Sequence, residues 1–106
     1  MSAFTLDSLA SLIASRAAAP ADRSYTRSLL DGGIAHSSKK FGEEAVELVI
    51  AAMERDQTAI KNEAADVVYH LLVVLQAASV SLQDVVSELE RRTLRSGLEE
   101  KASRQE

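Results

Sequence analysis

Two pairs of carboxylates constrain the fold of this chain more than any other feature of its sequence. Glu44 and Glu47 lie three residues apart in a stretch with helical periodicity, and Glu63 and Asp66 have the same spacing in the next such stretch. Residues three apart on a helix share a face, so each pair points in one direction. The residues between the pairs suffice to finish one helix, turn and begin an antiparallel second helix. That return would set the two pairs opposite each other.

The convergence of four carboxylates has a chemical consequence. Like charges in a partly buried cleft repel one another unless a counterion neutralises them. A hard divalent cation with oxygen ligands suits this role, so we predict a Mg²⁺ site, with Mn²⁺ as a substitute, formed by these four residues. The alternative is an ordinary solvated helix surface on which Glu43 and Glu44 pair with Lys39 and Lys40.

Two further side chains lie near the acidic pairs. His70 follows Asp66 by four residues and shares its face, so it either orients a carboxylate, touches a substrate phosphate, or is a core histidine satisfied by one hydrogen bond. Lys40 precedes Glu44 by four residues and either contacts a phosphate or forms a surface salt bridge. Neither His36 nor His70 has a glutamate three residues before it, which disfavours a di-iron site and leaves an all-oxygen site.

The periodicity of apolar residues predicts helices throughout, and no strand-like alternation stands out. The expected helices cover about 5–18, a short segment from Tyr25 to Leu30, about 34–55, about 57–79 and about 82–96. The fold class is therefore all-α, a small bundle of four to five helices. We expect one domain over residues 1–96 and a charged, frayed tail over 97–106.

Local signals place the ends of these helices. Thr5 or Asp7 is expected to cap the first helix, and Ser24 the short one after a loop at residues 20–24. Ser81 begins a capping box for the last helix, and Gly32-Gly33 stops the short one. Gly42 lies inside the long helix, which indicates a tight packing contact or the approach of a ligand.

Residues 67–75 are apolar nearly all round rather than along one stripe. A helix of this kind is buried on all sides, which a single domain of this size struggles to achieve. We therefore expect a partner chain to complete the fold, most simply a second copy in a two-fold dimer.

Composition excludes several functions. The net charge of -4 over 106 residues and the scarcity of aromatics argue against a nucleic-acid partner. Without cysteine there is no disulfide, thiolate nucleophile or cysteine-bearing metal site. No apolar run reaches the roughly 18 residues of a membrane helix, and no secretory signal is evident, so we expect a soluble, cytoplasmic protein without a membrane partner. The sequence also lacks a phosphate-binding GxxxxGK[ST] loop, a GxGxxG fingerprint and an HExxH motif.

Two longer strings contain the acidic pairs, Lys-Phe-Gly-Glu-Glu-Ala-Val-Glu at 40–47 and Asn-Glu-Ala-Ala-Asp-Val-Val-Tyr-His-Leu-Leu-Val at 62–73. Together they resemble phosphoribosyl-ATP pyrophosphohydrolases, within the all-α nucleoside-triphosphate pyrophosphatase superfamily. The superfamily's sparse pattern, Glu-x-x-Glu followed by Glu-x-x-Asp, is matched by the four carboxylates. The match extends to Ser24-Tyr25-Thr26, Leu29 and Gly33 upstream, and to residues 81–85, Leu89 and Arg92 downstream.

The resemblance implies a helical bundle that dimerises and binds Mg²⁺ through its acidic residues. It implies nucleotide (ATP-type) binding and hydrolysis of the α–β phosphoanhydride of phosphoribosyl-ATP to phosphoribosyl-AMP and pyrophosphate, the second step of histidine biosynthesis. The four carboxylates would bind one or two Mg²⁺ ions, while Glu43 would position or deprotonate the attacking water or serve as a further ligand. The expected substrate contacts are Lys40, Lys39, Tyr25, Thr26, His70 and Arg92.

Two other functions are compatible with the residues. One is a housekeeping nucleotide pyrophosphatase that acts on stray or damaged triphosphates with the same metal chemistry. The other is a non-catalytic helical dimer whose carboxylates are surface charge.

Overall fold

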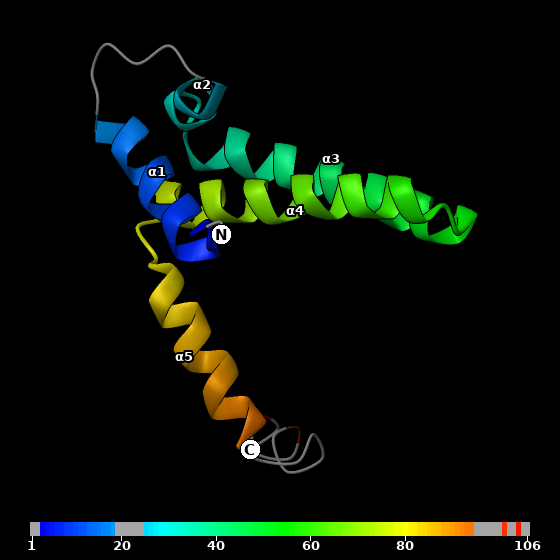
Figure 1. The fold of residues 1–106 in the computed structure, drawn as a ribbon. Helices are drawn as coiled ribbons and strands as arrows, with labels where there is room; N and C mark the ends of the chain where they lie inside the picture. The colour runs from blue at the N-terminus through cyan, green and yellow to red at the C-terminus, as the bar shows by residue number, and fades with distance from the viewer. Residues whose placement is uncertain (1–2, 19–24, 95–100, 102–103, 105–106) are drawn as a thin grey trace.

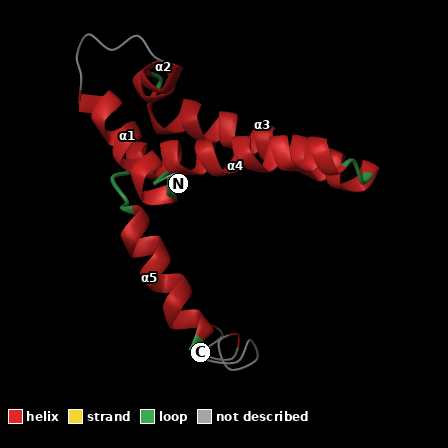
Figure 2. Ribbon diagram, in the orientation of Figure 1, coloured by secondary structure: helices red, strands yellow, loops and turns green. Residues whose placement is uncertain are grey.

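A computed structural model describes residues 3–18, 25–94, 101 and 104. The described residues form helices and no strand, which confirms the all-α prediction (Figures 1 and 2). The helices are α1 (Leu6–Ala18), α2 (Tyr25–Asp31), α3 (Gly33–Glu54), α4 (Gln57–Ala77) and α5 (Leu82–Thr93). The predictions for the loop at 20–24, for the Ser24 cap and, Lys101 and Arg104 aside, for the tail at 97–106 lie outside the described residues.

An antiparallel hairpin of α3 and α4 dominates the fold (Figure 1). Arg55 ends α3 in the left-handed region with φ 59°, and its N–H donates to the carbonyl of Ala52. Asp56 then caps α4, because its side chain accepts a hydrogen bond of 3.1 Å from the N–H of Ala59. This tight connection forces the two helices to run back along each other, as the spacing of the acidic pairs predicts.

A small core holds α1 and α2 against α4. Its buried side chains are Ile13 of α1, Leu29 of α2, and Leu72 and Val73 of α4. Only part of the apolar stretch at 67–75 is buried by this core, and Leu71 remains 37% exposed. The burial expected for the stretch is therefore not completed within one chain.

The helix caps agree with most of the local signals. Thr5, rather than Asp7, caps α1, because its Oγ1 accepts from the N–H of Ser8 while the Ser8 Oγ accepts from the N–H of Thr5. Ser81 caps α5 by accepting from the N–H of Asp84. The helix α5 ends at Thr93, earlier than the predicted 96.

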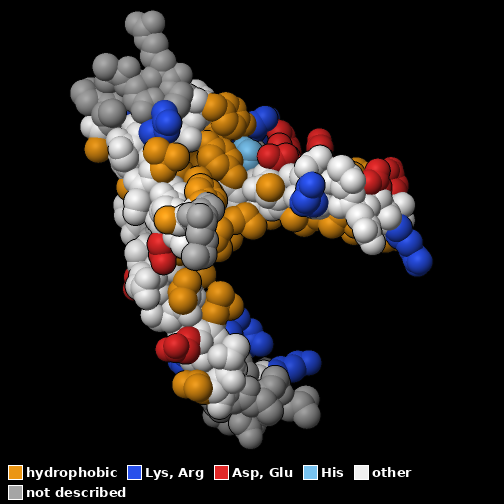
Figure 3. All heavy atoms as spheres, in the orientation of Figure 1, with side chains coloured by type: hydrophobic (Ala, Val, Ile, Leu, Met, Phe, Trp, Pro, Cys, Tyr) orange, Lys and Arg blue, Asp and Glu red, His pale blue; other side chains and the backbone are white. Residues whose placement is uncertain are grey.

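Beyond the cap, α5 leaves the bundle. Leu82 packs against the core, but α5 is absent from the helix pairs that pack extensively on one another. It extends away from the α3–α4 hairpin, so that the hairpin and α5 form two diverging arms (Figure 1). Hydrophobic side chains lie on the inner sides of both arms (Figure 3). Among the described residues no single helix could span a membrane; α4 and α5 would pass a test of length and composition only as a pair bent by 113°.

The glycines differ in what they contribute. Gly33 starts α3 with φ +79°, a conformation that a side chain strains. A Cβ on the preceding Gly32 would come within 2.7 Å of His36, so both glycines are needed at this turn, for different reasons. At Gly42 an added Cβ would meet nothing within 4 Å among the described residues. The expectation of a tight packing contact there is wrong within the described chain, and the approach of a ligand remains a prediction.

These environments predict opposite effects of the same substitution. Gly33→Ala should lower the free energy of unfolding by about 1 kcal/mol, because alanine resists the left-handed conformation. Gly42→Ala should raise it by roughly 0.5–1 kcal/mol, because it removes an interior helix glycine without a clash. Urea denaturation at one fixed protein concentration measures both, and a loss of stability in Gly42→Ala would contradict the open environment of that residue.

Candidate active site

The α3–α4 hairpin brings three of the predicted carboxylates together. Glu44 of α3 and Glu63 and Asp66 of α4 each place a carboxylate oxygen within 4.8 Å of the others. Glu47 lies outside this three-residue group, but it is close enough to act on Glu63 electrostatically and shares a groove with it. The predicted opposition of the two acidic pairs is thus present, with Glu47 at the edge.

Glu63 is the most perturbed member of this group. Its Oε2 is buried and has no hydrogen-bond partner among the residues that the structure describes. Desolvation raises the pKa of Glu63, and the nearby charges of Glu47, Asp66 and Glu44 raise it further. A buried carboxylate oxygen without a donor, surrounded by other carboxylates, is suited to a hard cation. The donor set therefore fits a Mg²⁺ or Mn²⁺ ion.

The basic residues of α3 border this cluster. The Nζ of Lys40 lies 3.2 Å from the Oε2 of Glu43, so the salt-bridge alternative for Lys40 is present, with Glu43 as the partner. This hydrogen bond is the main cause that raises the pKa of Lys40, and the charges of Glu43, Tyr25 and Glu44 add to it. Lys40 is therefore close enough to Tyr25 of α2 and to Glu44 for both to act on it electrostatically, whereas Lys39 is exposed.

A second cluster joins α2 to α4 beside the carboxylates. The Nδ1 of His70 donates to the carbonyl oxygen of Asp66 at 2.8 Å, since a carbonyl can only accept. The Nε2 is then the acceptor for the hydroxyl of Tyr25 at 3.3 Å. His70 is 4% exposed, so it matches the core-histidine alternative, with both ring nitrogens bonded.

The same cluster holds Thr26. The hydroxyls of Thr26 and Tyr69 are hydrogen-bonded to each other, and the Tyr69 ring stacks on Tyr25 with centroids 6.3 Å apart. Thr26 is buried, which gives it a packing role against α4. Tyr69 did not emerge from the sequence reasoning, although a hydroxyl-bearing residue within an apolar stretch, three residues after Asp66, is a usable signal.

A groove of about 220 Å³ extends from the carboxylates along the hairpin. It is lined by Glu47, Ile50, Ala51, Glu54, Ala59 and Glu63. Glu54 is a further acidic residue that sequence reasoning missed; its position seven residues after Glu47, two helical turns along the same face, could have indicated it.

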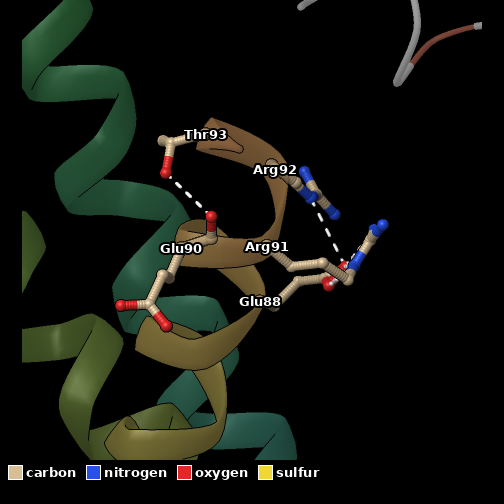
Figure 4. Close-up of polar contacts among 5 residues, drawn as sticks. All are labelled: Glu88, Glu90, Arg91, Arg92 and Thr93. Atoms are coloured by element: carbon tan, nitrogen blue, oxygen red, sulfur yellow. Dashed lines mark hydrogen bonds and ion pairs between the residues drawn. The ribbon is translucent and has the colours of Figure 1, made fainter. Parts of the chain in front are cut away.

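Arg92 belongs to α5, which extends away from the α3–α4 hairpin that holds Glu44, Glu63 and Asp66 (Figure 1). It lies 3.6 Å from Glu88, which also forms a 2.6 Å ion pair with Arg91 (Figure 4). Of the residues expected to contact substrate, Arg92 is therefore the one that the single chain leaves remote.

The fold and the site define an all-α class of protein in which an acidic groove lies along two antiparallel helices. The sequence pattern of the family described as phosphoribosyl-ATP pyrophosphohydrolase matches residues 6–93. The chain is 56% identical over 104 residues to a phosphoribosyl-ATP pyrophosphatase of Agrobacterium fabrum, covering 98% of this chain and 97% of the relative. It is 55% identical over 106 residues to phosphoribosyl-ATP pyrophosphatase 1 of Bradyrhizobium diazoefficiens, covering 100% of both.

The chain belongs to the phosphoribosyl-ATP pyrophosphohydrolase family and is an enzyme that hydrolyses a phosphoanhydride. The resemblance carried by residues 40–47 and 62–73 is thereby confirmed.

The raised pKa of Glu63 predicts a pH-dependent stability. The folded protein binds the Glu63 proton more tightly than the unfolded chain, so ionising Glu63 destabilises the fold as pH rises through the raised pKa. In metal-free buffer, Glu63→Gln should therefore be more stable than the wild type at neutral pH. The difference should shrink as pH falls toward the ordinary carboxyl pKa.

Denaturant midpoints measured across this pH range test the expectation. Glu90→Gln, a change of the same charge on α5, is the matched control and should show no such trend. Equal midpoints for Glu63→Gln and wild type at every pH would contradict the raised pKa of Glu63.

Proposed function

We propose that the chain hydrolyses the α–β phosphoanhydride of phosphoribosyl-ATP, giving phosphoribosyl-AMP and pyrophosphate, in the second step of histidine biosynthesis. The names of the relatives support this substrate. The observation that carries the chemistry is the buried Oε2 of Glu63, without a hydrogen-bond partner in the described part of the chain, beside the carboxylates of Glu44 and Asp66. Such an arrangement is suited to recruiting a divalent cation and, through it, a polyphosphate.

Glu44, Glu63 and Asp66 would hold Mg²⁺, with Glu47 at the edge as a fourth carboxylate. Bound Mg²⁺ would supply charge neutralisation on the phosphates and a Lewis acid at the scissile bond. Because the α3–α4 pairing fixes these side chains before any ligand arrives, little reorganisation is required.

The surrounding residues suit the remaining tasks. Lys40, with Lys39 behind it, adds positive charge on the α2 side of the cluster. Tyr25 has its hydroxyl oriented by His70, so it presents an ordered phenol next to Lys40. Glu43 is exposed and paired with Lys40; once Lys40 turns to a phosphate, the Glu43 carboxylate is free to accept a proton from water.

The working form is a homodimer in this proposal. Val46, Val49, Ile50 and Met53 repeat at helical spacing on α3 and form an apolar stripe, hereafter the α3 stripe, in which Met53 is 79% exposed. A continuous exposed stripe of this kind marks an interaction surface rather than a solvated face. A second copy would cover it and complete the burial of α4.

A pyrophosphate-release assay on phosphoribosyl-ATP tests the function. Wild-type protein should release pyrophosphate with Mg²⁺ and show little release in its absence. Glu63→Gln should lose about 100-fold or more of the turnover, because it removes one metal-binding charge while keeping the shape. Glu90→Gln should retain it.

A panel of ordinary nucleoside triphosphates measured in parallel separates the proposal from a housekeeping pyrophosphatase. Faster turnover of those triphosphates than of phosphoribosyl-ATP would refute the proposed substrate. Near-normal turnover in a folded Glu63→Gln protein would refute the site.

The dimer predicts a mass in solution of twice 11.4 kDa at micromolar concentration, measured by light scattering after size exclusion. Met53→Asp should shift the mass toward the monomer, because it places a charge in the proposed interface. A wild-type mass of 11.4 kDa would contradict the dimer.

A further inference from the structure

Each chain has a second unpaired apolar stripe, on α5. Val85, Val86 and Leu89 repeat at helical spacing there, and Val86 and Leu89 are 44% and 55% exposed. We call this the α5 stripe. Hydrophobic side chains lie on the inner sides of both arms, which diverge from each other (Figure 3). The α3 and α5 stripes of one chain therefore do not cover each other.

We propose that α5 of one subunit packs its stripe on the α3 stripe of a second copy, and that its Arg92 thereby enters the partner's active-site groove to bind a substrate phosphate. This inference rests on the proposed function, since it assigns Arg92 to the phosphate-bearing substrate. Each active site would then be complete only in the dimer.

A second copy fits the two stripes better than an unrelated partner. A two-fold axis makes the contact reciprocal, so one interface covers the α3 and α5 stripes of both copies. The α5 stripe extends over about one helical turn and the α3 stripe over about two, so the shorter stripe fits within the longer one. The charges are also complementary, because the groove beside the α3 stripe contains Glu47, Glu54 and Glu63 while the last turn of α5 is basic.

Ile50 connects the α3 stripe to the site. It belongs to the stripe and also lines the groove with Glu47 and Glu54. A helix lying on the stripe therefore has one edge along that groove. Side chains on that edge would reach the carboxylates and any phosphate held there.

Helical position selects Arg92 rather than Arg91 for this edge. Arg92 follows Leu89 by three residues and Val85 by seven, so it flanks the α5 stripe, and the three line one surface groove together. Arg91 is about 100° round the helix from Arg92 and is not among the residues that line this groove, and its Nε and Nη2 hold Glu88 at 2.9 and 2.6 Å. Arg92 lies 3.6 Å from Glu88, a looser pairing that it can exchange for a phosphate.

Single substitutions test the choice of arginine. Arg92→Ala should reduce turnover of phosphoribosyl-ATP by about tenfold or more, the cost of a lost hydrogen bond to a charged group. Arg91→Ala, the same change at the neighbouring position outside the groove, should stay within about twofold of the wild type. Wild-type turnover in Arg92→Ala would overturn the proposal; both variants should keep wild-type helical content, because both side chains are exposed.

Mixed dimers test whether Arg92 acts in the other subunit. Arg92→Ala and Glu63→Gln chains with different affinity tags are co-expressed and the heterodimer is purified through both tags. Its one complete site combines the Glu63 of one chain with the Arg92 of the other, so it should recover about half of the wild-type turnover per dimer. A heterodimer no more active than Arg92→Ala would overturn the proposal. The wild-type assay reports separately on the proposed function.

Cross-linking tests the contact without relying on activity. The chain has no cysteine, so Leu89→Cys on α5 and Ile50→Cys on α3 introduce the sole thiols. Oxidising a mixture of the two variants should give a covalent Leu89–Ile50 dimer, while neither variant alone should cross-link efficiently. Cross-linking of Ile50→Cys with itself would show that the α3 stripes pair with each other and would overturn the proposed arrangement.

Discussion

The antiparallel pairing of α3 and α4 is the constraint on which the rest of the structure depends. A short turn capped by Asp56 fixes the register of the two helices. That register places Glu44 against Glu63 and Asp66. Repulsion among these carboxylates lowers the stability of the fold, and it contributes to the raised pKa of Glu63. Helix packing supplies the free energy that holds the carboxylates together, and a cation can then recover the electrostatic part.

A polar cluster between α2 and α4 fixes the other side of the site. His70 follows Asp66 by one helical turn and bonds its carbonyl, so the helix that positions the carboxylate also positions the imidazole. The imidazole in turn orients the hydroxyl of Tyr25, and the Tyr69–Thr26 bond secures α2 against α4. Buried polar groups of this kind make α2 a fixed wall of the site, because detaching it would leave several of them unpaired.

Local signals explain how much could be predicted from the sequence. The bounds of α3 and α4 were predictable to within one or two residues, because periodicity and end signals act over a few residues. Spacing also predicted the approach of Glu44, Glu63 and Asp66. Glu47 was less predictable because Glu63 and Asp66, with the same spacing, both lie in the cluster; how α3 packs on α4, and not the spacing, decides that Glu47 lies at its edge.

The remaining features depend on contacts that no local pattern specifies. The hydrogen bonds that satisfy His70 involve Tyr25, on another helix. The direction of α5 is not encoded in its own residues either, since an amphipathic helix specifies only that one face must be covered. Similarly, the open space at Gly42 depends on what lies opposite α3.

The exposed apolar stripes and the crowded carboxylates both lack, within a single chain, the contacts that would stabilise them. A chain of 106 residues buries only a small core, and its longest helix pair also places several carboxylates close together. The α3 stripe is adjacent to the carboxylate groove, since Ile50 belongs to both. Covering the stripe would therefore also lower the local dielectric at the groove and strengthen the attraction between the carboxylates and a cation. In the proposed dimer, assembly and cation affinity would therefore be coupled through Ile50, which borders both the α3 stripe and the carboxylate groove.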